Sequence, residues 1–276
     1  MALSSLIAHG QPSGASDESR RSTPAEPDFT SFTPYLGVGM AVARPERTRY
    51  VDGGDSGHAA LYGDEDSFDA GAFDTGLKFD LVAGVRSRSG LRAQVEVRLP
   101  SESDWQGNTN YDNAGQHQPS EATLDARQFI VAGFYDFRRW TLGPGRAARP
   151  YLGVGAGTSD YRVSGYVQRF PDPDNPAGYL RRGPGGEIPF TAIPDGTGRT
   201  FAWVLAAGIS VPVLKESHLD LSYRYTDAGG IATDVADITI VRYRADGTRR
   251  EIMVPINETT VDYRTHALLM SLRFEL

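Results

Sequence analysis

The 276-residue sequence predicts an all-β protein, an eight-stranded antiparallel β-barrel. Three observations predict this fold class. Apolar and polar residues alternate in several segments, and no segment sustains a helical periodicity. The connections between segments alternate strictly between long and short. The expected strands are, in chain order, 33–43, 73–86, 90–99, 124–138, 149–160, 199–211, 217–226 and 263–276.

The stretch LRAQVEVRLP, residues 91–100, shows the alternation most clearly. Leu91 and Val95 belong to its apolar set, whereas Arg92 and Glu96 belong to its polar set. A period of two gives a strand two unlike faces. The same pattern recurs in 77–86, 219–226 and 266–276.

The connections place all the long loops at one end of the predicted barrel. The turns at 87–90, 138–149 and 212–217 are short or medium. They alternate with four long connections, 44–72, 100–123, 161–198 and 227–262. Outer-membrane barrels have short periplasmic turns and long extracellular loops. The sequence therefore predicts a transmembrane β-barrel with four long extracellular loops.

In lipid, the apolar face of each strand points outward and the charged face points into the lumen. The interior of an eight-stranded barrel is just wide enough for side chains to fill it. Charges removed from water need partners, so we expect a network of ion pairs that acts as a plug. The expected members of this luminal charge network are Lys78, Asp80, Arg86, Arg92, Glu96, Arg98, Asp136, Arg138, Asp220, Arg224, Arg273 and Glu275.

Aromatic residues near strand ends predict two girdles at the membrane interfaces. The expected girdle residues are Tyr35, Tyr135, Phe137, Trp140, Tyr151, Phe201, Trp203, Tyr223, Tyr225 and Phe274. Ordinary strand aromatics are the alternative interpretation, because aromatic side chains favour strands.

Two domains are expected. Residues 1–31 form a disordered leader or linker, whose start is either the end of a signal peptide or a plain flexible segment. Residues 32–276 form the barrel. Within its last long loop, two alternating runs flank Asp246-Gly247, which predicts a hairpin at 237–256.

Several segments resemble the opacity-type outer-membrane barrels, part of the wider group of small OmpA-like barrels. They are TPYLGVGMAVA (33–43), RPYLGVGAGTSDY (149–161), WVLAAGISVPV (203–213), LDLSYRYTDAG (219–229) and HALLMSLRFEL (266–276). The resemblance implies an outer-membrane location, contact with lipids and lipopolysaccharide, and insertion by the assembly machinery that reads the last strand. Phe274 and Leu276 would supply that signal, although family members typically end in an aromatic residue. The family offers no catalytic residue and no cofactor.

The remaining chemistry narrows the function classes. A net charge of −7 argues against nucleic acid, and the absence of cysteine excludes thiol chemistry. Of the five histidines only His266 lies in a predicted strand, without a nucleophile at a mechanistic spacing, so we expect neither an enzyme nor a metal site.

Three functions remain open. The first is a structural or adhesive surface protein whose loops contact other surfaces or proteins. The second is a narrow porin, for which the small luminal residues Gly84, Ala132, Ala206 and Gly208 would leave room for water. The third is a soluble, lipocalin-like binding barrel with the two faces exchanged.

Overall fold

The structure is a computed structural model that describes residues 31–53, 57–58, 60, 67–110, 117–143, 146–172, 174–179 and 181–276. The predicted leader lies outside these residues except for Ser31. All regular elements in the described part of the chain are β-strands. Among those same residues, no helix is long and apolar enough to cross a membrane.

Eight long strands close into an antiparallel barrel. They are β1 (Phe32–Pro45), β4 (Gly76–Ser87), β5 (Leu91–Asn110), β6 (His117–Asp136), β8 (Arg146–Arg169), β12 (Gly196–Leu214), β13 (Ser217–Ala232) and β16 (Thr259–Glu275). Each pairs with the next, and β16 returns to β1 with Tyr35 opposite Glu275 and Pro45 opposite Thr265. The predicted eight-stranded barrel is confirmed.

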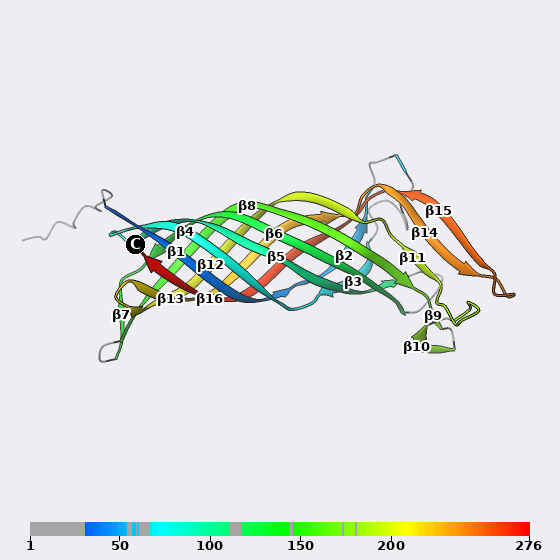
Figure 1. The fold of residues 1–276 in the computed structure, drawn as a ribbon, viewed down its shortest axis with the longest axis horizontal. Coiled ribbons are helices and arrows are strands. Elements are labelled where there is room, and N and C mark those ends of the chain that lie inside the picture. Colours follow the sequence, from blue (N-terminus) through cyan, green and yellow to red (C-terminus); the bar gives the residue numbers. More distant parts are fainter. Residues whose placement is uncertain are drawn as a thin grey trace, which may run out of the picture.

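Strands β5 and β8 are about twice as long as predicted, and β6 is also longer. Strands β5 and β6 have 20 residues each and β8 has 24, whereas about 9 to 11 residues suffice to cross a bilayer. Strands β2 (Arg47–Asp52) and β3 (Ser67–Phe73) prolong β1 and β4 in the same direction. The predicted loops are therefore largely a continuation of the barrel wall (Figure 1).

Shorter strands lie at both ends of the barrel. Strands β14 (Ala236–Tyr243) and β15 (Arg249–Ile256) form a hairpin whose turn contains Gly247 at φ 83°, at the position where the sequence predicts one. Strand β11 (Phe190–Ala192) joins this hairpin to β8, and β9 (Pro171–Asp172) pairs with β10 (Asn175–Tyr179). Strand β7 (Trp140–Gly143) lies at the opposite end, near the C-terminus (Figure 1).

The polarity of the wall inverts along the barrel. On β6, Phe129 and Val131 point outward and are about half exposed, at 48% and 55%, and Gln128 points inward. Nearer the start of β6, the outward residues are polar, such as Glu121, and Leu124 is buried inside. We call the part with an apolar outside, built on β1 and β4, the belt section. The part with a polar outside, built on β2 and β3, is the rim section.

Candidate functional site

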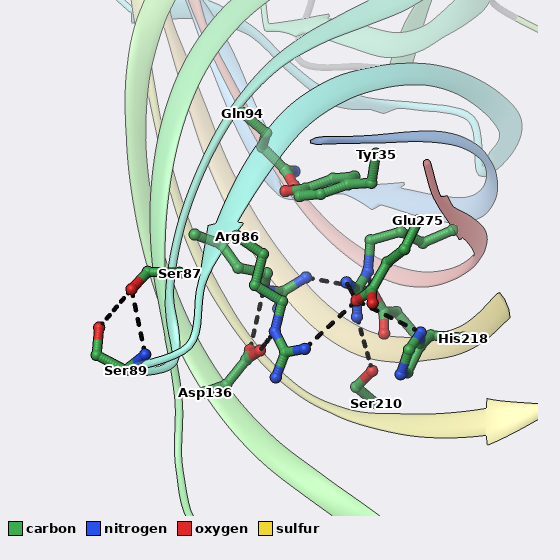
Figure 2. Close-up of polar contacts among 12 residues, drawn as sticks. Tyr35, Arg86, Ser87, Ser89, Gln94, Asp136, Ser210, His218 and Glu275 are labelled. Atoms are coloured by element: carbon green, nitrogen blue, oxygen red, sulfur yellow. Dashed lines mark hydrogen bonds and ion pairs between the residues drawn. The ribbon is translucent and has the colours of Figure 1, made fainter. Parts of the chain in front are cut away.

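The lumen of the belt section contains two clusters of ion pairs, one around Arg92 and one around Arg224. Nearest the short turns, Arg86 lies between two carboxylates, 3.0 Å from Asp136 and 3.3 Å from Glu275 (Figure 2). Arg273 also contacts Glu275, at 3.1 Å, and donates to the hydroxyl of Ser210. These contacts tie β4, β6, β12 and β16 together across the barrel.

The next layer is organised by Arg92. Its guanidinium lies 2.9 Å from Asp136 and 3.2 Å from Asp220, and Asp220 is also 3.2 Å from Arg273. The same guanidinium lies over the rings of Phe134 and Tyr151, at 4.9 and 4.5 Å from their centroids. Arg92 is therefore held both by charge and by two cation–π contacts.

A third layer is centred on Arg224. Its side chain lies 2.6 Å from Glu96 and 3.3 Å from Asp80, and Asp80 is also 3.1 Å from Arg98. These buried carboxylates each face at least one arginine, which is the arrangement that makes buried charge tolerable.

Lys78 ends the charged layers at the border with the rim section. Its ammonium donates to the hydroxyls of Ser101 and Ser103 at 2.7 and 2.9 Å, and no ion pair of Lys78 occurs within the described part of the chain.

Side chains fill this interior almost completely. Two luminal cavities, one beside Arg92 and one beside Lys78, measure about 20 and 10 Å³, which is about the space for one water molecule each. Two of the glycines expected to leave room for water instead accommodate aromatic rings. A β-carbon on Gly84 would lie 2.6 Å from Cζ of Tyr35, and one on Gly208 would lie 2.7 Å from Cζ of Tyr151.

Above Lys78, the rim section has an aromatic core. Tyr50 packs on Trp105 and Tyr166 with ring centroids 5.0 and 4.6 Å apart, and Phe73 packs on Trp105 and Tyr263 at 5.1 and 5.3 Å. All five side chains are less than 5% exposed. This aromatic core closes the lumen above the ion pairs.

One carboxyl group lies inside this core. Asp69 accepts hydrogen bonds from the indole of Trp105 at 3.2 Å and from the hydroxyl of Tyr166 at 2.6 Å. Its Oδ1 has no hydrogen-bond partner among the described residues. Burial raises the pKa of Asp69 above the ordinary value, against the opposing effect of the hydrogen bonds from Ser120, Tyr166 and Trp105.

The structure places eleven of the twelve predicted charged residues in the lumen. Arg138 is the exception: β6 ends at Asp136, so Arg138 lies exposed in the following turn, and its assignment to the lumen was wrong.

The assignment of two residues to the girdle was also wrong, because Tyr35 and Tyr151 are buried in the lumen. The other eight lie on the outer surface: Tyr135, Phe137, Trp140, Phe201, Trp203, Tyr223, Tyr225 and Phe274. Leu276 is exposed beside the end of β16, and its role in assembly stays a prediction together with that of Phe274.

His266 lies on the outer surface of β16. Its Nε2 is 2.8 Å from the carboxylate of Glu46, its Nδ1 is 2.5 Å from the hydroxyl of Tyr223, and its ring packs near Tyr225. Sequence reasoning missed the partner Glu46, which belongs to a predicted loop, and it missed the rim residues Asp69 and Trp105 for the same reason.

An apolar outside and a charged inside define the belt section as a transmembrane β-barrel of the outer-membrane type. The lipocalin-like alternative is therefore wrong for this section, because its lumen holds charges and its apolar side chains face out.

The chain is similar in fold to several solved structures. No known family model and no curated protein matches the chain. The outer membrane protein OprG from Pseudomonas aeruginosa is 12% identical, with a TM-score of 0.46 over 88% of this chain and 96% of OprG. The outer membrane protease OmpT from Escherichia coli is 8% identical, with a TM-score of 0.45 over 90% and 99% of the two chains. Neisserial surface protein A is 15% identical, with a TM-score of 0.39 over 89% and 99%. These likenesses carry no argument about the function of this chain.

Proposed function

We propose that the protein is a bacterial outer-membrane surface protein of structural or adhesive function. In this proposal, the belt section anchors the chain, and the rim section presents a binding surface to the outside of the cell. The observation that carries the proposal is the filled interior, in which two clusters of ion pairs, around Arg92 and around Arg224, are followed by Lys78 and then by the aromatic core. A barrel with such an interior offers no continuous path for a solute.

The construction of the rim supports a binding role. The β14–β15 hairpin is rooted by Ile238 and Ile256, both 2% exposed, and β11 links it to the barrel wall. Arg242 of this hairpin lies over the ring of Phe170, 3.7 Å from its centroid. Ordered loops on a rigid scaffold are the usual place for recognition.

The proposal assigns no catalytic activity to the chain. His266 is already engaged by Glu46 and Tyr223 on the outer surface, which supports an interfacial role for its ring. The proposal also includes insertion by the outer-membrane assembly machinery. It further includes surface partners that contact the rim section.

Single-channel recording tests the filled lumen. The protein is refolded, its folding is verified by a heat-sensitive gel shift, and its conductance is measured in a planar bilayer. We expect a silent barrel. Steady discrete openings would overturn the proposal in favour of the narrow porin.

Adhesion tests the rim directly. Cells displaying the protein are compared with cells displaying a variant in which an Asn-Gly turn replaces residues 242–250, because Val241 and Glu251 pair and can close a two-residue turn. Retention is measured on surfaces coated with matrix proteins or with glycosaminoglycans. We expect the intact protein to increase retention and the shortened hairpin to reduce it; equal retention of cells with and without the protein on every surface contradicts an adhesive role.

A further inference from the structure

A hollow of about 520 Å³ lies on the outer side of the rim section, over strands β5 and β6. Outward side chains line it: Asp104 and Gln106 on β5, and Glu121 and Thr123 on β6. Binding sites for small molecules typically measure about 300 to 1,000 Å³. The hollow therefore has the size of a ligand site, and its described lining includes no residue of the luminal ion pairs or of the β14–β15 hairpin.

A β-bulge in strand β8 borders this hollow. Glu121 pairs with Val167 but Thr123 pairs with Ser164, so β8 spans one residue more than β6 at this point. Gly165, at φ 64°, lies in the bulge and lines the hollow. Glycine accommodates a bulge of this kind without strain, and bulges are common at barrel rims and beside active sites. The break in the register thus coincides with the hollow.

The floor of the hollow is backed by the aromatic core. A β-carbon on Gly107 would collide with Asp69, Trp105 and Ser120, so the backbone lies directly on these buried side chains. Trp105 also lines the hollow, while its indole donates to Asp69 and to Ser120 at 3.2 and 3.1 Å. Such a floor is already formed before a ligand arrives, which reduces the entropy lost on binding.

The lining is rich in hydrogen-bond acceptors. Asp104 accepts from the hydroxyl of Thr123 at 3.1 Å, and Glu121 lies 2.5 Å from Arg169. An ionised carboxylate has room for about four hydrogen bonds, so both acids can accept further donors. The amide of Gln106 forms no hydrogen bond with a described residue, and it can both donate and accept. No lysine or arginine occurs in the described lining.

The hollow lies well above the apolar belt. Asp104 comes five residues after Leu99, the last apolar outward residue of β5. This distance is about 17 Å along a strand, or about 12 Å in height at a tilt of about 45°. The headgroup region on each side of a bilayer is roughly 5 to 8 Å thick. The hollow therefore opens to water beyond the headgroups, where a partner from outside the membrane can reach it.

We propose that this hollow binds a neutral saccharide chain presented by another surface. The inference rests on the proposed function, because it requires the rim section to lie outside the cell. Sugar hydroxyls donate to ionised carboxylates in charge-assisted hydrogen bonds, which are the strong ones. Half-buried Pro119 adds an apolar contact for the C–H face of a sugar ring. The same carboxylates repel sulfated and carboxylated chains, because the described lining contains no cation.

The test measures saccharide binding by the folded barrel in a neutral detergent. A printed array of neutral oligosaccharides, with sulfated and sialylated derivatives of the same chains, is screened first. Titration calorimetry then measures the affinity for the strongest neutral member and for its sulfated derivative. The test variant carries D104N and Q106A. A matched control carries E102Q and D125N, which change outward residues of the same two strands outside the described lining. The heat-sensitive gel shift verifies the folding of each variant.

We expect a neutral oligosaccharide to bind at least tenfold tighter than its sulfated derivative. The test variant should lose at least about tenfold in affinity, as for the loss of one hydrogen bond to a charged group, and the control should stay within about threefold. Binding to no neutral member of the array would overturn the proposal, as would equal affinity of the intact protein and the test variant, or a preference for the sulfated chain. Conductance and hairpin-dependent retention are measured separately, so a failed saccharide site leaves the surface-protein proposal standing.

Discussion

The ring of Tyr35 lies against Gly84, so closely that a β-carbon on residue 84 would come within 2.6 Å of Cζ of the ring. The two residues face each other on β1 and β4, and the hydroxyl of Tyr35 donates to Gln94 at 2.6 Å. The lumen can hold a buried tyrosine here only because the opposite residue has no side chain.

Gly84→Ala should therefore destabilise the barrel. The new methyl group must displace Tyr35 or the carbonyl of Ala93, and overpacking of this kind costs about 1 to 3 kcal/mol. Urea unfolding of the barrel refolded in lipid vesicles measures the change. Gly133→Ala is the matched control, because a β-carbon there meets nothing closer than 3.9 Å. Equal stability of the two variants would show that the ring does not depend on the glycine.

Arg224→Met should cost about 3 to 5 kcal/mol of unfolding free energy, because it leaves the buried carboxylate of Glu96 without its partner. Glu96 loses the arginine that lies 2.6 Å away, while Asp80 keeps Arg98. The same urea experiment measures it, with Arg264→Met as control. Arg264 is 43% exposed and pairs with Asp262 and Asp227 near the surface, and such pairs contribute about 0 to 1 kcal/mol. Adding Glu96→Gln to Arg224→Met should restore part of the loss, and a further loss would argue against the pair.

Val95→Arg should block insertion or destabilise the inserted barrel by about 2 to 4 kcal/mol, since Val95 faces lipid within the belt section. Gln106→Arg changes an outward residue of the same strand, β5, in the polar rim section, and should be tolerated. Arg98→Ala should insert normally while disturbing its contacts to Asp80 and Gln128. Partition into vesicle membranes and the gel shift report the outcome; equal damage from Val95→Arg and Gln106→Arg would contradict the boundary between the two sections.

The sequence predicts the belt section well because lipid imposes a strict alternation there. On β5, Val95 and Val97 face out while Glu96 and Arg98 face in, so both faces of the strand can be recognised in the sequence. Beyond the register shift between Arg98 and Ser101, the outside meets water and the residues become polar. That half of the strand has the composition of a loop, so the sequence predicts the end of the strand at residue 99.

The misplaced tyrosines have a different cause. The nearness of Tyr35 and Tyr151 to strand ends predicts a place in the girdle. Their alternation phase places them with the inward residues Gly37 and Gly153, opposite Leu36 and Leu152. The phase was readable from the sequence, whereas the pairing of Tyr35 with Gly84 and of Asp69 with Trp105 depends on strand register, which a single sequence does not specify.

The buried carboxyl of Asp69 predicts a pH dependence of stability. Its pKa is raised by burial in the folded protein, whereas an unfolded aspartate titrates near about 4. Between these two values the folded state binds more protons, so the stability of the rim section falls as pH rises from about 4 through the raised pKa.

Asp69→Asn removes this titration while keeping a side chain of the same shape. Trp105 fluorescence during urea unfolding at several pH values compares the two proteins, with the other tryptophans, Trp140 and Trp203, replaced by phenylalanine in both. We expect the Asn variant to become progressively more stable than the parent as pH rises. A constant difference across that range would contradict the raised pKa, and a parent that gains stability with rising pH relative to the variant would reverse its sign.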